Sequence, residues 1–307
     1  MDIIILLFGF SIGLVLLVKG ADEMVSSAIQ IALKFKLPSS IVGATFIGFG
    51  TSAPELFAST RAALKGDLDL GIGNIVGSNI ANSLLVVAVL YLALPKDYSK
   101  KINLNKISPT WMAILTTIFV STYVLTNKFP FLLGVALLVL VLYVIYKMIS
   151  SESDDEEGLI EEEKSYIWLR GGMSLVATLY GSQLVVENAV EIASIFGVSS
   201  LVIGSTIIAI GTSLPEVAGT ISAAKMRKPD IVFGNIFGSN LFNIGLVGGA
   251  AIMISPGEIS SAIDYQLFIM YFVSFVVIFL SRNIIKRNVI LGYVFIALYV
   301  LFLISLF

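Results

Sequence analysis

The sequence predicts an all-α polytopic membrane protein, with ten transmembrane helices arranged as two inverted-topology five-helix repeats. Three observations carry this prediction: an apolar composition, a series of long apolar runs, and an internal duplication. Of the 307 residues, 57% are hydrophobic and 13% are charged, which is too little polar surface to cover a soluble globule. The mean hydropathy of +0.97 agrees. We therefore expect the chain to lie in a lipid bilayer.

The composition also excludes several kinds of chemistry. The chain contains no cysteine and no histidine, which removes thiolate sites, the usual zinc ligand and the usual proton shuttle. Any metal site must therefore be built from oxygen atoms, and we expect no cofactor. The net charge of −2 gives no reason to expect a nucleic-acid partner.

Ten apolar runs approach the roughly 20 residues that a bilayer span needs. The first run lacks a basic segment before it and a small-residue cleavage pattern, so we interpret it as a retained span rather than a signal peptide. In chain order the predicted spans are Ile3–Lys19 with an amphipathic extension to about Lys34, Ser39–Ala63, Gly71–Leu94, Ser108–Thr126, Phe129–Tyr146, Tyr166–Phe196, Val198–Ala224, Ile231–Ile254, Asp264–Leu280 and Val289–Leu306.

The internal duplication is visible in two pairs of motifs. GTSAPE at Gly50–Glu55 is matched by GTSLPE at Gly211–Glu216, and GNIVGSNIAN at Gly73–Asn82 is matched by GNIFGSNLFN at Gly234–Asn243. One offset of 161 residues aligns both pairs without a gap. Because the first copy contains an odd number of spans, the second copy must enter the membrane from the opposite face. The two copies are then inverted relative to each other.

The predicted domains are a first repeat at 1–149, an acidic linker at 150–165 and a second repeat at 166–307. Loops after odd-numbered spans hold 15 Lys or Arg residues against 3 on the other side. The positive-inside rule therefore predicts a multi-pass cell-membrane protein with both termini outside and the linker in the cytoplasm. The eight acidic residues of the linker lack the Gly-centred loop of an EF-hand, and we interpret them as a solvated hinge rather than a regulatory calcium site.

Two glutamates are expected near the middle of their spans, where a charge costs on the order of 2.5–3.5 kcal/mol. They are Glu55 and Glu216, and each directly follows a proline. Proline interrupts helical hydrogen bonding, so we expect broken helices whose freed carbonyls, around positions 47–51 and 208–212, point at a ligand. Broken helices at membrane depth are tolerated only where they line a cavity or are buried in protein.

Hydroxyl and amide groups accompany both glutamates at helical spacing. Such hard oxygen donors suit Ca²⁺ and Na⁺. The candidate metal ligands are Thr51, Ser52, Glu55, Ser78, Asn82, Thr212, Ser213, Glu216, Ser239 and Asn243.

Other polar and small residues leave alternatives open. Serine and threonine hydroxyls often bond back to their own helix, and the asparagines at 74, 79, 235 and 240 are either ligands or interhelical contacts. Spans 1 and 6 also carry polar residues, which either line an aqueous path or lie at the membrane interface, and we favour the interface. These residues are Lys19, Asp22, Glu23, Gln183, Glu187, Asn188 and Glu191. Close helix packing is expected at Gly73, Gly77, Gly234 and Gly238.

These motifs make the chain resemble the cation/calcium exchanger superfamily, most closely its prokaryotic Na⁺/Ca²⁺ exchanger branch. The resemblance implies that transmembrane helices 2, 3, 7 and 8 form a core around several cation sites. Transmembrane helices 1 and 6 are implied to slide across that core during alternating access. It also implies that Glu55 and Glu216 are the main calcium ligands, supported by Thr51 and Thr212. Ser52, Ser213, Ser78 and Ser239 are implied at flanking sodium sites. Many exchangers of this branch have Asp where this chain has Asn243, which leaves the driving ion open.

The leading functional hypothesis is a secondary antiporter that exchanges Ca²⁺ for Na⁺ by alternating access, with ion sites at the midplane between the repeats. The alternative is a Ca²⁺/H⁺ antiporter that uses the same two glutamates. A cation channel and an intramembrane glutamate protease fit less well, because the inverted broken helices and the duplicated acidic motif favour transport, and we expect no enzyme activity. The expected partners are Ca²⁺, Na⁺ or H⁺ and the lipid bilayer, and we expect the chain to function as a monomer.

Overall fold

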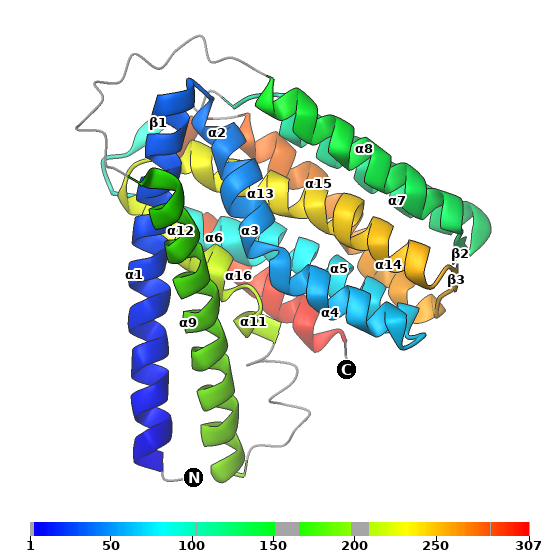
Figure 1. Ribbon diagram of the computed structural model, residues 1–307, viewed down its shortest axis with the longest axis horizontal. Helices are drawn as coiled ribbons and strands as arrows, with labels where there is room; N and C mark the ends of the chain where they lie inside the picture. Colours follow the sequence, from blue (N-terminus) through cyan, green and yellow to red (C-terminus); the bar gives the residue numbers. More distant parts are fainter. Residues whose placement is uncertain (1–2, 102–103, 151–165, 198–208, 283, 307) are drawn as a thin grey trace.

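A computed structural model describes residues 3–101, 104–150, 166–197, 209–282 and 284–306. Within these ranges the chain is almost entirely helical (Figure 1). Six helices are long and apolar enough to cross a membrane, and a bent pair at Ser39–Thr51 and Ala53–Leu64 makes a seventh candidate. The predicted all-helical, multi-pass membrane fold is therefore confirmed. The acidic linker and the first part of the predicted seventh span lie outside the described residues.

The first half of the chain begins with one long helix and continues through two interrupted ones to an antiparallel pair. Short π-helical segments, η1 and η2, interrupt the second and third predicted spans. Its elements are α1 (Ile3–Phe35), α2 (Ser39–Val42), η1 (Gly43–Gly48), α3 (Phe49–Thr51), α4 (Ala53–Leu64), α5 (Leu68–Ala81), η2 (Asn82–Val86), α6 (Val87–Ala93), β1 (Ser99–Lys101), α7 (Ile107–Thr126), β2 (Lys128–Phe129) and α8 (Phe131–Ile149).

The second half repeats this order. Its elements are α9 (Ile167–Ile195), α11 (Ala209–Gly211), α12 (Leu214–Lys225), α13 (Pro229–Phe242), η4 (Asn243–Gly248), α14 (Gly249–Ile254), β3 (Gly257–Glu258), the 3₁₀ turn η5 (Ser261–Ile263), α15 (Asp264–Ser281), β4 (Ile284–Lys286) and α16 (Val289–Ile304).

The helix bounds follow the duplication seen in the sequence. The offset of 161 residues carries both ends of α4 onto those of α12, and both ends of α5 onto those of α13. It also carries Asn82, where η2 begins, onto Asn243, where η4 begins. A π-helical turn widens the helix and is frequent at functional sites. The two copies thus share their local structure as well as their motifs.

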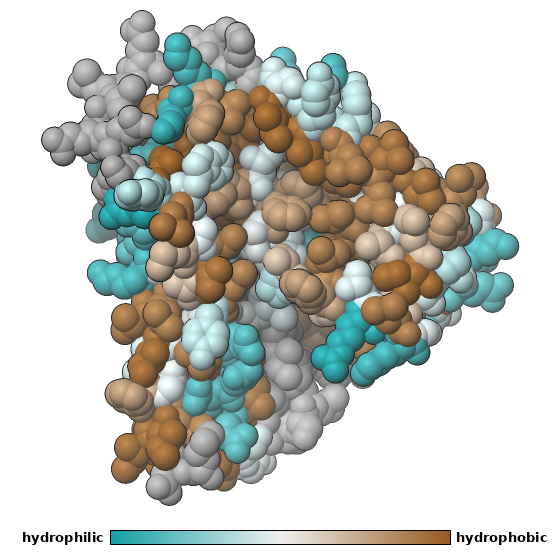
Figure 2. Space-filling model, in the orientation of Figure 1, coloured by the Kyte–Doolittle hydropathy of each residue, from teal (hydrophilic) through white to brown (hydrophobic). Residues whose placement is uncertain are grey.

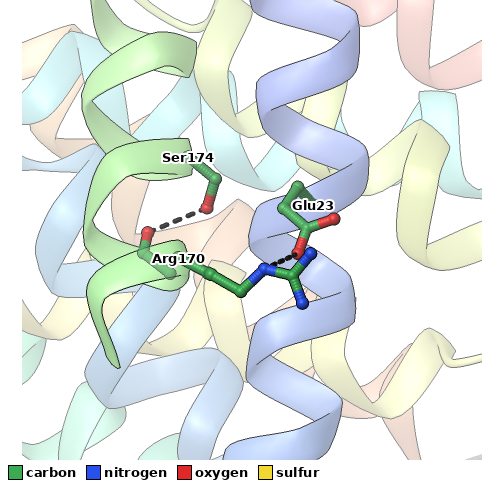
Figure 3. Close-up of polar contacts among 4 residues, drawn as sticks. Glu23, Arg170 and Ser174 are labelled. Carbon is green, nitrogen blue, oxygen red and sulfur yellow. Dashed lines mark hydrogen bonds and ion pairs between the residues drawn. The ribbon is translucent and has the colours of Figure 1, made fainter. Parts of the chain in front are cut away.

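Helices α1 and α9 lie side by side at one edge of the molecule (Figure 1). Their close approach depends on glycine, since a Cβ atom at Gly13 would lie 2.9 Å from the carbonyl oxygen of Gly181. Figure 3 shows Arg170 of α9 reaching Glu23 of α1, with 3.6 Å between Nε and Oε1. This exposed ion pair adds little stability, so small residues and apolar contacts hold the helix pair together.

The core of the molecule surrounds α13, in which every residue from Ile231 to Phe242 is buried. Around it pack α2, η1, α7 and α12. Brown apolar residues cover much of the visible face in Figure 2, and a hydrophilic strip lies over the lower half of α9. That strip contains the exposed side chains of Gln183, Glu187 and Glu191. An apolar outer surface around a well-packed core is what a bilayer requires.

Two small antiparallel sheets link the two halves. Strand β1 pairs with β4, and β2 pairs with β3. Figure 1 shows β1 at one end of the bundle and the β2–β3 pair at the other. Each sheet takes one strand from each half, so the halves are joined at both ends.

Candidate cation site

Both GTSxPE motifs lie where a helix breaks. The segments Ser39–Thr51 and Ala53–Leu64 meet at a bend of 46°, which confirms the predicted break. Pro54 and Pro215 lie in the first turns of α4 and α12, where proline's missing N–H has no intrahelical partner to lose. Glu55 and Glu216 occupy the same first turns. There the positive end of the helix dipole favours a carboxylate.

The two carboxylates come together in the interior of the molecule. Their exposed fractions are 4% for Glu55 and 2% for Glu216, and the two negative charges are close enough to repel each other. Ser78 lies within hydrogen-bonding reach of Glu55, and Thr51 lies within reach of Glu216. The Thr51 contact crosses from the first copy of the motif to the second, so side chains of both copies meet here.

Four predicted residues contribute buried oxygen atoms that have no hydrogen-bond partner within the described part of the chain. They are Ser52 Oγ, Glu55 Oε2, Glu216 Oε2 and Asn243 Oδ1. Buried polar atoms are normally paired, so each unpaired oxygen needs an explanation. All four are hard oxygen donors of the kind that Ca²⁺ takes as ligands. Among the described residues no group of three or more Asp, Glu, His or Cys side chains is placed to hold a metal ion.

Other predicted ligands have protein partners. Asn82 Nδ2 donates to Asn240 Oδ1 at 3.1 Å, and Asn240 Nδ2 donates to Ser83 Oγ at 3.1 Å. Ser239 Oγ lies 3.3 Å from two acceptors, Gly48 O and Asn235 Oδ1. The interhelical interpretation of the asparagines therefore fits Asn240, and Asn82 acts in the same network.

The prediction that the helix breaks leave their carbonyls free is wrong at four positions. Gly48 O accepts from Ser52 N at 3.2 Å, and Ile210 O accepts from Ser213 N at 3.1 Å. Thr51 Oγ1 donates to Ile47 O at 3.0 Å, and Ser182 Oγ of α9 donates to Gly211 O at 3.2 Å. A hydroxyl satisfies Gly211 O because Pro215, four residues further along, has no backbone N–H to donate. Residues 198–208, which carry part of the second predicted carbonyl set, lie outside the described residues.

A cavity of about 220 Å³ reaches the site from the side of α16. Ser78, Thr212 and Ser213 line it together with Gly73 and Gly77. The predicted close packing at these two glycines is wrong, because a Cβ atom at either one would meet nothing within 4 Å. Here the small side chains leave space beside a candidate ligand instead of bringing two helices together.

A second cavity, of about 540 Å³, lies on the side of α9. Its lining includes Gln183 and Glu187 of α9, Thr212, and both motif prolines. These two α9 side chains therefore line a cavity, and the choice between an aqueous path and the interface stays a prediction for spans 1 and 6. Gln183 Nε2 donates to Glu187 Oε1 at 2.7 Å, which holds both at the cavity wall.

Sequence reasoning missed Ser59. Its hydroxyl donates to Gly71 O at 3.1 Å and accepts from Asn74 Nδ2 at 2.9 Å. Asn74 Nδ2 also lies 3.5 Å from the carbonyl oxygen of Glu55, so this contact ties α5 to the turn that carries the carboxylate. The sequence does contain a signal for this residue, because the 161-residue offset places a second hydroxyl, that of Thr220, at the position equivalent to Ser59.

Comparison with known proteins settles the family. The family model described as "sodium/calcium exchanger protein" matches residues 5–151 and 166–307. The chain belongs to the sodium/calcium exchanger family. Among its relatives, the putative antiporter CaxA of Alkalimonas amylolytica is 38% identical over 82% of this chain and 81% of its own length. The sodium/calcium exchanger MaX1 of Methanosarcina acetivorans is 29% identical over 96% of this chain and 97% of its own length.

Solved structures of this family have the same fold. The sodium-calcium exchanger NCX_Mj, soaked with zero Na⁺ and Ca²⁺, superposes with a TM-score of 0.84 and 28% identity, covering 100% of both chains. The resemblance inferred from the motifs is thereby confirmed at the level of the superfamily.

Proposed function

We propose that this exchanger-family protein is a secondary antiporter that moves Ca²⁺ in exchange for Na⁺ by alternating access. The observation that carries the proposal is the pair of buried carboxylates at duplicated helix breaks, each with an oxygen that no described group satisfies. The names of MaX1 and NCX_Mj describe sodium/calcium exchange, which supports the same ions here.

In this proposal Glu55 and Glu216 bind either one Ca²⁺ or a set of Na⁺ ions. The two ions compete because they share ligands. Further ligands come from the hydroxyls and amides of the predicted set, which in the first copy are Thr51, Ser52, Ser78 and Asn82 and in the second are Thr212, Ser213, Ser239 and Asn243. With no ion bound, the two carboxylates repel each other, so the empty site resists switching and leak is suppressed.

The proposal includes ten spans in two inverted repeats. The sheets support it, because β1 and β4 follow the third and ninth predicted spans, whereas β2 and β3 follow the fourth and eighth. Inverted repeats of five spans place the first pair on one face of the membrane and the second pair on the other. Charge counts then favour cytoplasmic odd-numbered loops and a cytoplasmic linker.

The test is calcium flux into vesicles that contain the purified protein. We expect Ca²⁺ uptake when the vesicles hold Na⁺ and the outside solution does not, and no sustained uptake when Na⁺ is equal on both sides. Uptake that persists without any outward Na⁺ or H⁺ gradient would overturn the antiporter proposal and favour a channel.

A second candidate, Ca²⁺/H⁺ exchange, is favoured by Asn243. This residue leaves the site with two carboxylates, and its Oδ1 has no partner among the described residues. Uptake driven by a Na⁺ gradient at clamped internal and external pH supports Na⁺ coupling, whereas uptake driven only by a pH gradient supports the alternative. Asn243→Asp adds a third carboxylate, and we expect it to change the dependence on Na⁺ more than the yield of folded protein.

A further inference from the structure

The sheet formed by β1 and β4 brings two basic connections together. Lys100 pairs in register with Ile285, and Ser99 pairs with Lys286. Residues 95–106 contain four lysines and one aspartate, and residues 282–288 contain three basic residues and no acidic one. The single aspartate, Asp97, is bound to Arg227, with 2.6 Å between Oδ2 and Nη2. Positive charge is thus concentrated here in a chain whose net charge is −2.

Most of these basic side chains are exposed on the surface of the molecule. We define the basic patch as Lys100, Lys106, Arg282, Lys286 and Arg287; the first four are exposed and Arg287 is half-buried. Successive strand residues point to opposite faces, so the fully buried Ile285 fixes the inner face of β4 and turns Lys286 outward. The neighbouring Ile284 is 63% exposed, which places apolar surface directly beside the charges.

Arg287 carries an unused hydrogen-bonding group. Its Nε atom is shielded from solvent and has no acceptor within the described part of the chain. Guanidinium groups bind phosphate oxygens through paired N–H donors. A phosphate at the patch would therefore satisfy a donor that the protein itself leaves unpaired.

Aromatic residues mark the membrane surface at the same end of the molecule. Lys106 directly precedes α7, and Trp111 follows within that helix's first turns. The ring centroids of Trp111 and Tyr143 are 5.6 Å apart, and the Lys147 amine lies 5.8 Å from the Tyr143 ring centroid. Tryptophan and tyrosine gather at the headgroup level of a bilayer. A bilayer whose headgroup region lies at these rings would bring lipid phosphates to the basic patch.

We propose that the basic patch binds the headgroups of anionic phospholipids in the leaflet at whose surface it lies. The lipid holds the two connections together across the sheet, with phosphate on the basic side chains and acyl chains along the apolar surface that begins at Ile284. Each basic residue near an anionic surface strengthens binding by on the order of fivefold. This inference does not depend on the transported ions.

The experiment compares lipid binding by matched variants in neutral detergent. Bound lipid is counted by native mass spectrometry after addition of phosphatidylglycerol or phosphatidylcholine at physiological ionic strength. We expect the wild type to retain phosphatidylglycerol in preference. The triple variant Lys100→Gln/Lys286→Gln/Arg287→Gln is expected to bind phosphatidylglycerol roughly 100-fold more weakly.

Two control variants distinguish lipid binding at the patch from the effect of overall charge and from the effect of misfolding. Arg61→Gln/Lys65→Gln/Lys128→Gln makes the same charge change at exposed residues outside the patch and is expected to bind like the wild type. Lys100→Arg/Lys286→Arg/Arg287→Lys keeps the charge and is expected to retain the lipid. Equal binding by the glutamine variant and the wild type, or equal loss in the Arg61 control, overturns the proposal. Displacement of the lipid by glycerol phosphate at matched concentration also overturns it, because the site then recognises a free anion.

Discussion

The two copies of the GNxxGSN segment have nearly the same sequence but different surroundings. In the second copy, a Cβ atom at Gly234 would collide with the backbone of Ser40, and one at Gly238 with the backbone of Ala44. In the first copy, Gly73 and Gly77 face open space and line a cavity. The same small residues bring helices together on one side and leave a space on the other.

The two GTSxPE helix breaks also have similar sequences but differ in how exposed their residues are. Thr51 is fully buried, whereas the equivalent Thr212 is exposed and lines both cavities. Pro54 is exposed, whereas Pro215 is buried. Under the alternating-access function proposed above, near-identical sequences in unlike environments are what one state of the transport cycle would show. On that proposal, the differences between the copies belong to one state of the molecule, and the shared motif belongs to the proposed ion site.

The largest expected effect is a loss of Ca²⁺ uptake when either of the two glutamates that the copies share is replaced. Glu55→Gln and Glu216→Gln should each reduce Ca²⁺ uptake by roughly 30-fold or more, because removing one partner of a buried charge interaction costs about 2–5 kcal/mol. The reductions should be similar, since in the proposed function both carboxylates bind the same ion. Vesicle flux measures the uptake, and thermal unfolding without Ca²⁺ provides the control. Both variants should be at least as stable as the wild type, because each removes the repulsion between the carboxylates.

Uptake at the wild-type rate in either variant would refute the shared role. A loss of uptake accompanied by a large fall in the unfolding temperature would instead show that the glutamates are needed for folding.

The next prediction concerns the glycines, where the copies differ. Gly234→Ala should destabilise the protein by about 1–3 kcal/mol, because the added methyl group overpacks the contact with Ser40. Gly73→Ala should be neutral or stabilise by up to about 1 kcal/mol, because alanine favours a helix and the site has room. Thermal unfolding in detergent compares the two. Equal effects at both positions would mean that the copies are packed alike in solution.

Much of this arrangement could be predicted from the sequence, and the reasons are local. Apolar runs identify spans because a bilayer leaves few alternatives, and proline directly before Glu55 predicted the bend. The sequence could not predict which copy packs its glycines against another helix, since Gly73 and Gly234 occupy identical motifs. It also could not predict that Asn82 bonds to Asn240 while Asn243 Oδ1 stays unpaired, because these contacts depend on how the two copies are packed.

A smaller effect is expected at the hydroxyl that sequence reasoning missed. Ser59→Ala removes the bonds to Gly71 and Asn74 and should cost about 1–2 kcal/mol, because Asn74 then keeps only its longer contact with the carbonyl oxygen of Glu55. Thr220→Val removes a buried hydroxyl with no partner among the described residues, and should be neutral or slightly stabilising. Chemical unfolding of both variants in detergent tests the difference. A larger cost for Thr220→Val would show that its hydroxyl is bonded in solution.

The smallest effect lies at a turn where the copies again diverge. Gly66 and its equivalent Arg227 both have left-handed backbone, with φ of 79° and 59°. A non-glycine residue pays about 1–2 kcal/mol for this conformation, and Arg227 offsets part of that cost through its bond to Asp97. That bond, together with the charge of Arg227, holds the pKa of Asp97 below its ordinary value of 3.8.

Because the folded pKa is the lower one, the bond contributes stability above about pH 4, and this contribution disappears as the pH falls through the folded pKa. Arg227→Gly should therefore differ little from the wild type at neutral pH, where relief of strain and loss of the bond oppose each other. Below the folded pKa of Asp97, which itself lies under 3.8, only the relief of strain remains, and the variant should become the more stable protein. Unfolding temperatures measured across this range test the prediction, with Asp97→Asn as the control that loses the bond but keeps the strain. A constant difference between Arg227→Gly and the wild type at every pH would show that the bond does not contribute, and that the left-handed turn alone distinguishes the two copies here.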